Sequence, residues 1–179
     1  MIQNHFLLTE NACYPPGHFY SPIIDVEAVK RDADRIWKNR GQHKVQAVLL
    51  NDELQLDYLK QILSFYGELP FKDSPSDSHR YYFANPYYGY TDAITLYGLM
   101  RSLSPKRIIE IGSGFSSALM LDTNEIFFNG SINLTFIEPF PDRLNSLLRS
   151  ADRQKVKIFE QEVQKVDFSV FEALEAGDI

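Results

Sequence analysis

The residues best suited to chemistry lie at positions 110–117, where a short apolar run leads into a predicted helix. This segment reads Glu-Ile-Gly-Ser-Gly-Phe-Ser-Ser. Glycine at positions 112 and 114 lacks the Cβ atom that would hold a ligand away from the backbone. The free N–H groups at the start of the following helix can bind a polar or anionic group. The segment therefore predicts a ligand-binding turn. Because Gly-x-Gly also occurs in ordinary strand-to-helix turns, this prediction depends on whether polar residues elsewhere in the chain complete a binding site.

Two acidic residues further along the chain are placed to complete such a site. Glu138 ends the next predicted strand, where a carboxylate can accept hydrogen bonds from both hydroxyls of a ribose. Glu162 follows the third predicted strand, and a carboxylate there can accept a hydrogen bond from an adenine amino group; Glu160 is the alternative. Because the carboxyl ends of parallel strands meet at one edge of a sheet, the three loops form an adenosine-shaped site.

Glu110 indicates which adenosine ligand this site takes. A dinucleotide needs positive potential for its pyrophosphate, and its Gly-x-Gly-x-x-Gly pattern has Ser117 in place of the last glycine here. A carboxylate two positions before Gly112 suits a ligand that carries a cationic amino group. S-adenosylmethionine has an ammonium and a sulfonium group and no phosphate. We therefore expect S-adenosylmethionine as the cofactor.

The run from Arg107 to Ser117 resembles motif I of the class I S-adenosylmethionine-dependent methyltransferases, and Phe136-Ile-Glu-Pro139 resembles the acidic motif that follows it. The helix that begins near Tyr90-Thr-Asp-Ala93 and the approach through Pro105 are also similar to a bacterial subfamily. The resemblance covers roughly residues 80–179. It implies that six residues line the methionine and ribose side of the site: Glu110, Gly112, Ser113, Gly114, Ser116 and Ser117. It also implies that Glu138 binds the ribose hydroxyls and that Glu162 and Val163 flank the adenine.

The element pattern predicts an α/β fold with a Rossmann-like parallel sheet. Branched, apolar runs at 107–111, 133–138 and 156–159 read as strands, and helical stretches follow each of them. A helical region precedes the sheet. Its expected helices are one capped by Asp25 and running to about Arg40, one capped by Asn51 and ended by Gly67, and one capped by Thr91 or Asp92.

We expect two parts, an N-terminal extension at 1–78 and the N-terminal half of a methyltransferase domain at 79–179. The resemblance places a fourth strand beside the first, and the sequence ends at Ile179, where that strand would begin. The sheet is therefore expected to be incomplete, with about three core strands. An unpaired edge on the first strand predicts self-association through that edge or a cover from the N-terminal helices. No residue of the sequence can be assigned as a catalytic base, and we expect the chain alone to be inactive.

Composition limits the partners. The net charge of −6 disfavours nucleic acid, and no apolar stretch is long enough for a bilayer. The single cysteine and the lack of a signal peptide favour a cytoplasmic location, and the four histidines lack metal-ligand spacing. The methyl acceptor is expected to be a small molecule or sugar.

Two other classes of protein stay open, a nicotinamide-dependent oxidoreductase and a cofactor-like interaction domain without chemistry. The aromatic run at 81–90 is suited to packing or to a substrate platform. Tyr90 lies at the start of the predicted helix that follows this run, so we expect it to be the aromatic residue nearest the glycine turn.

Overall fold

The computed structural model describes residues 14–18, 21, 23–38 and 49–179. The chain divides into two compact units, Met1–Leu50 and Asn51–Ile179. Residues 51–78, which we predicted to belong to the N-terminal extension, are grouped with the sheet in the second unit. None of the helices in the described ranges has the length and apolar composition that a bilayer crossing requires.

The first unit contains two short helices, α1 (Val26–Arg31) and α2 (Ala33–Trp37). Asp25 caps α1 as predicted, because its carboxylate accepts the Ala28 N–H at 2.9 Å. A single helix reaching Arg40 is wrong. Asp32 has φ −101° and ψ 8°, so the helix breaks there, and its carboxylate binds the Arg35 side chain. The expected end at Arg40 and Gly41 lies outside the described residues.

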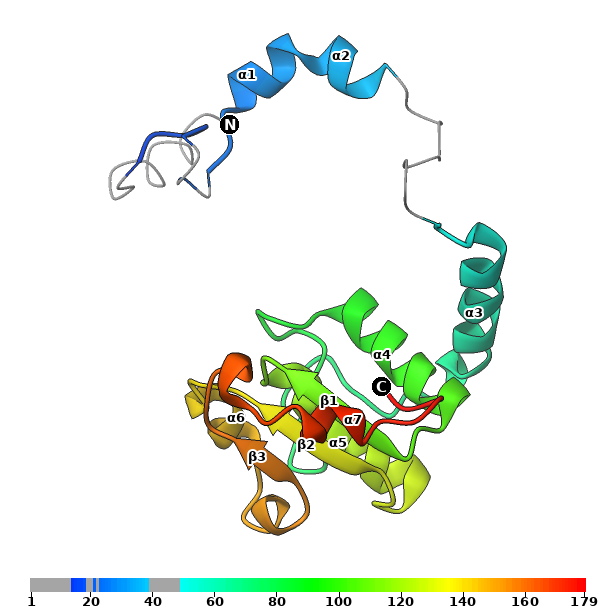
Figure 1. Cartoon of the computed structure of the whole chain (residues 1–179). Helices are drawn as coiled ribbons and strands as arrows, with labels where there is room; N and C mark the ends of the chain where they lie inside the picture. Colours follow the sequence, from blue (N-terminus) through cyan, green and yellow to red (C-terminus); the bar gives the residue numbers. More distant parts are fainter. Residues whose placement is uncertain (1–13, 19–20, 22, 39–48) are drawn as a thin grey trace. The chain divides into compact units, whose positions relative to one another are not determined.

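The second unit is an α/β fold built on a Rossmann-like parallel sheet (Figure 1). Among the described residues the sheet has three strands in the order β1 (Arg107–Ile111), β2 (Asn133–Ile137) and β3 (Lys157–Phe159), all parallel. The connections contain α5 (Phe115–Phe128) and α6 (Asp142–Leu147). The predicted strands are therefore confirmed to within one residue at each end.

Helices α4 (Tyr90–Leu103), α5 and α6 pack together beside the sheet. Their apolar side chains form a core with alternate residues of β1 and β2, namely Met100, Ile108, Met120, Leu134, Phe136 and Leu144. Burial of such side chains is the main stabilising term for a fold of this size. This layer therefore holds the strands from which the candidate site projects.

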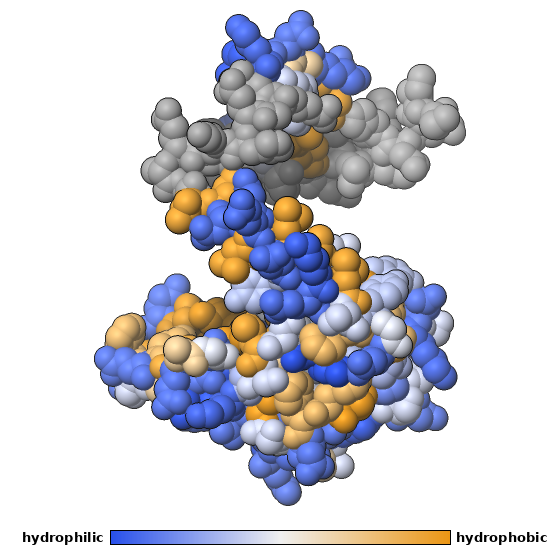
Figure 2. All heavy atoms as spheres, turned by 90° about the vertical axis from the view of Figure 1, so that its right-hand side faces the viewer, coloured by the Kyte–Doolittle hydropathy of each residue, from blue (hydrophilic) through white to orange (hydrophobic). Residues whose placement is uncertain are grey.

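Helix α3 (Asp52–Ser64) packs on α4, where Ile62 lies against Gly98. The short 3-10 helix η1 (Tyr66–Glu68) follows it. Asn51 precedes α3 as predicted, but it has φ 53° and its side chain makes no capping hydrogen bond. Helix α3 faces the viewer in Figure 2 and exposes Leu54, Leu56, Leu59 and Leu63.

The start of α4 differs from the prediction. Helix α4 begins at Tyr90 with Gly89 in the capping position, so neither Thr91 nor Asp92 caps it. Both residues lie inside the first turn, where Asp92 still interacts favourably with the helix dipole. The helical stretch after β3 is short, because it consists of the 3-10 helix η3 (Val163–Lys165) and the four-residue helix α7 (Ser169–Glu172).

The last residue of the chain pairs with β1. The Ile179 N–H donates to the Arg107 carbonyl at 3.2 Å, and the Ile109 N–H donates to the Ile179 carbonyl at 2.8 Å. The Asp178 carboxylate accepts the N–H groups of Lys106 and Arg107 at 3.1 and 3.0 Å. Ile179 thus occupies the place beside β1 where the resemblance expects a fourth strand.

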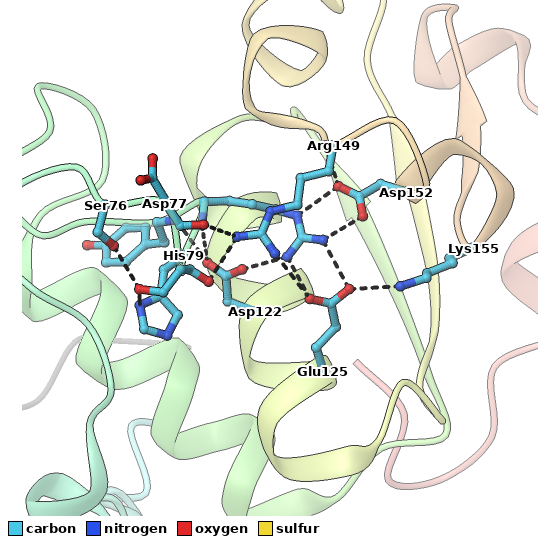
Figure 3. A network of polar contacts seen from close by, with 11 residues as sticks. Ser76, Asp77, His79, Asp122, Glu125, Arg149, Asp152 and Lys155 are labelled. Atoms are coloured by element: carbon cyan, nitrogen blue, oxygen red, sulfur yellow. Dashed lines mark hydrogen bonds and ion pairs between the residues drawn. The ribbon is translucent and has the colours of Figure 1, made fainter.

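A network of ion pairs around the buried Arg80 holds the loop that precedes α4, and Figure 3 labels its acidic members Asp122, Glu125 and Asp152. The Arg80 guanidinium donates to Asp122 at 2.6 Å, to Asp152 at 2.5 and 2.7 Å, and to Glu125 at 2.9 Å. Only 2% of the Arg80 side chain is exposed. Lys155 adds a second cation, 2.9 Å from Glu125. The network joins this loop to α5 and to the 3-10 helix η2 (Asp152–Gln154).

Candidate functional site

The glycine turn between β1 and α5 has the backbone that its sequence requires. Gly112 has φ +84°, a conformation that side-chain-bearing residues rarely adopt. Gly114 stands in the N-cap position of α5, and its N–H donates to the Ser117 hydroxyl at 2.9 Å. A Cβ atom on Gly114 would lie 3.1 Å from Arg143 Cδ. Glycine at these two positions therefore serves the turn itself and the close approach of another group to it.

Glu110 lies beneath this turn and is largely buried. The hydroxyls of Ser116 and Ser117 each donate to one of its carboxylate oxygens. Burial raises the pKa of the Glu110 carboxyl above its ordinary value, although the serine hydrogen bonds favour the charged form. Both hydroxyls thus face the buried carboxylate, so these serines shape the turn rather than present free donors.

Glu138 comes to the same turn from the neighbouring strand. One carboxylate oxygen accepts the Ser113 N–H at 2.9 Å, and the other accepts the Phe140 N–H at 2.8 Å. A carboxylate has about four acceptor sites, so further hydrogen bonds can be accepted. The structure therefore brings Glu110, Ser113, Ser116, Ser117 and Glu138 together at one edge of the sheet.

Three other predicted site residues bond elsewhere. Glu162 is exposed and pairs with Lys165 at 3.1 Å, and Val163 beside it is half-buried. The Tyr90 hydroxyl donates to Asp73 at 2.6 Å, and its ring stacks on Phe83 with 4.7 Å between centroids. Their contacts hold the loop after β3 and the start of α4, and their roles toward a ligand stay predictions.

A cluster of aromatic rings that the sequence did not predict lies beside the turn. The Tyr87 ring stacks on Phe115 with 6.0 Å between centroids, and Tyr82 meets Phe115 edge-on at 5.5 Å. The Arg143 guanidinium carbon lies 3.7 Å from the centre of the Tyr87 ring. The many tyrosines of this loop signalled packing, but nothing in the sequence showed which ring would face the turn.

Tyr88, next in the loop, has its hydroxyl in an acidic and buried environment. Burial raises the pKa of Tyr88 to about 12, and the charges of Asp92 and Glu110 add to this effect. Tyr88 therefore stays neutral at ordinary pH.

A separate hollow of about 440 Å³ lies at the C-terminal end of α5. Its polar side chains are already engaged, because Asn124 bonds both backbone groups of Ile132 and Glu125 pairs with Lys155. The hollow therefore offers fewer free polar groups than the glycine turn, which is the stronger candidate site.

The fold and the turn together define a Rossmann-like α/β protein whose sheet edge carries two converging carboxylates. The chain is 36% identical over 170 residues to an uncharacterized protein of Archaeoglobus fulgidus. The match covers 93% of this chain and 76% of that protein, so the chain belongs to the same family. No protein-family model matches the chain, and no solved structure matches it.

Proposed function

We propose that this protein binds S-adenosylmethionine at the glycine turn and is the cofactor-binding part of a methyltransferase. The observation that carries the proposal is the approach of Glu110 and Glu138 to one turn from neighbouring strands. Glu138 accepts the Ser113 N–H at 2.9 Å, and Glu110 accepts the hydroxyls of Ser116 and Ser117. Two carboxylates there favour a ligand with positive charge and oppose a pyrophosphate.

Each carboxylate has its own part in this proposal. Glu138 accepts hydrogen bonds from the ribose hydroxyls with the acceptor sites that Ser113 and Phe140 leave open. Glu110 orders the turn through two serines and contributes negative potential toward an ammonium group. Bound S-adenosylmethionine supplies the electrophilic methyl carbon, and the protein supplies orientation and proximity. We propose a small-molecule or sugar acceptor for the methyl group.

One observation favours the nicotinamide alternative. Arg143 Cδ lies 3.1 Å from the position of a Cβ on Gly114, so a cation stands beside the turn and can attract a phosphate. The carboxylates of Glu110 and Glu138 at the same turn act against an anionic ligand. The two cofactors therefore need a direct comparison.

Isothermal titration calorimetry of the full chain with S-adenosylmethionine and with NAD⁺ provides that comparison. We expect S-adenosylmethionine to bind more tightly. Glu138→Gln is expected to weaken its binding about 10- to 100-fold, because hydrogen bonds to charged groups contribute about 1.5–3 kcal/mol. Glu53→Gln, at an exposed position in the first turn of α3, is the matched control and is expected to bind normally. Tighter binding of NAD⁺, or no effect of Glu138→Gln, would contradict the proposal.

A further inference from the structure

We infer that the face of Tyr87 is a subsite for the sulfonium group of the methyl donor, and that the Arg143 guanidinium occupies it in the free chain. This inference rests on the proposed function and extends it. It assigns the side chain that distinguishes the charged donor from the neutral thioether left after methyl transfer.

The Tyr87 ring is held in place by an aromatic neighbour and is exposed at the surface. It stacks on Phe115, the residue after Gly114, with 6.0 Å between centroids and 23° between planes. Phe115 is in turn packed edge-on by Tyr82. Tyr87 nevertheless keeps 60% of its surface exposed. A fixed aromatic face beside a ligand-binding turn suits a cation, because the face of an aromatic ring carries negative charge density.

A cation already occupies this face. The Arg143 guanidinium carbon lies 3.7 Å from the Tyr87 ring centre, well within the range of a cation–π contact. Within the described part of the chain Arg143 forms no ion pair, so the ring is the principal partner of its charge. The contact therefore shows directly that this ring face accepts a positive group.

The same arginine stands where a ligand must approach the turn. Its Cδ lies 3.1 Å from the position of a Cβ on Gly114, the glycine whose missing side chain opens the backbone. A ligand that reaches Gly114 must displace the Arg143 side chain, and the displaced guanidinium leaves Tyr87 free. Because Arg143 is exposed, it moves into solvent without breaking an ion pair.

Exchange of one cation for another follows from this geometry. A sulfonium replaces the guanidinium on Tyr87, so the ring keeps a cationic partner when the donor binds. A neutral thioether offers no such exchange, and Arg143 then competes for the ring. The arrangement thus favours the methylated donor over the demethylated product and helps release that product.

Calorimetric titration of the full chain with S-adenosylmethionine and with S-adenosylhomocysteine tests the inference. Tyr87→Leu is expected to weaken donor binding about 3- to 30-fold, the range of a cation–π contact, with a smaller effect on the product. Tyr87→Phe keeps the aromatic face and is expected to retain the preference for the donor. Arg143→Met removes the guanidinium that both ligands must displace and is expected to tighten both, while the preference for the donor is retained.

The outcomes separate this inference from the function on which it rests. If the wild type binds neither ligand, the proposed function fails. If it binds both but Tyr87→Leu weakens both equally, Tyr87 is a packing residue and the inference is overturned. Weaker binding of both ligands by Arg143→Met would also overturn it, because Arg143 would then contact the ligands rather than compete with them. Circular dichroism spectra of each variant verify the fold.

Discussion

The Glu138 carboxylate lies 2.9 Å from the Ser113 backbone nitrogen and so joins the ends of two neighbouring strands. The parallel register pairs Ile111 with Ile137, so the residues that follow them leave the sheet at the same level. A carboxylate after β2 therefore reaches the turn after β1 without any long connection. The candidate site follows from the register of the sheet, and changes near it should affect binding more than folding.

The buried Glu110 carboxyl predicts an unusual dependence of stability on pH. Burial raises the pKa of Glu110 in the folded chain above its unfolded value near 4.3. The unfolded chain therefore loses this proton at a lower pH than the folded chain does, and the folded chain loses stability as pH rises from the unfolded pKa through the folded pKa. Glu110→Gln cannot titrate. We expect its free energy of unfolding, relative to the wild type, to increase as pH rises above about 4.

Urea unfolding of the wild type and Glu110→Gln at several pH values measures this difference. Glu172→Gln, at an exposed position, is the control for the loss of one carboxylate. A difference that falls as pH rises would show that the serine hydrogen bonds outweigh burial at Glu110.

The Arg80 network predicts a large loss of stability when the arginine is removed. Arg80→Met leaves the carboxylates of Asp122 and Asp152, which are 2% and 1% exposed, without their cation. We expect a loss of about 3–5 kcal/mol in the free energy of unfolding. Arg153→Met, at an exposed ion pair, is the control and should change it by less than about 0.5 kcal/mol. A loss below about 1 kcal/mol for Arg80→Met would contradict a structural role for the network.

Glu125, in the same network, predicts a loss of stability at low pH. The hydrogen bond from Arg80 lowers the pKa of Glu125 to about 2, against the smaller effect of burial. Its stabilising contribution is therefore complete above the unfolded pKa near 4.3 and is lost as pH falls toward about 2. Glu125→Gln should lose less stability than the wild type over that range in acid denaturation. If the free energies of unfolding of the two proteins fell equally with pH, Glu125 would not have the lowered pKa described here.

The sequence predicted the elements that depend on local pattern. The branched run at 107–111, the glycine turn after it and the acidic end of β2 all follow from residue types within a few positions of one another, and the structure has them. The α/β sheet was predictable because strands and helices alternate along the chain.

Features that depend on distant partners were not predictable. The Arg80 network joins residues 42 and 72 positions apart, and the contact of Tyr87 with Arg143 needs the folded sheet to exist. The break at Asp32 and the start of α4 at Tyr90 were missed for another reason. Helical spacing continues across Asp32, and Gly89 caps a helix without a side chain that marks the position.

The packing of α3 on α4 predicts that Gly98 tolerates no side chain. A Cβ at Gly98 would lie 2.5 Å from Ile62 Cγ2, far inside contact distance. We expect Gly98→Ala to lower the free energy of unfolding by about 1–3 kcal/mol, although alanine favours a helix by about 1 kcal/mol. Gly67→Ala, where nothing lies within 4 Å, is the control. Thermal unfolding of Gly98→Ala combined with Ile62→Ala should show partial rescue, and additive losses would contradict the steric explanation.

The outer edge of β1 predicts self-association of the chain. Among the described residues this edge is paired only where Ile179 bonds Arg107 and Ile109, and Ile111 beyond them is 60% exposed. An open strand edge beside an exposed apolar side chain favours pairing with another chain. Light scattering after size-exclusion chromatography should show a mass that rises with protein concentration, and Ile111→Lys should reduce it. Ile126→Lys on α5, also exposed, should leave the mass unchanged. A constant monomer mass for the wild type, or equal effects of the two lysines, would exclude association through this edge.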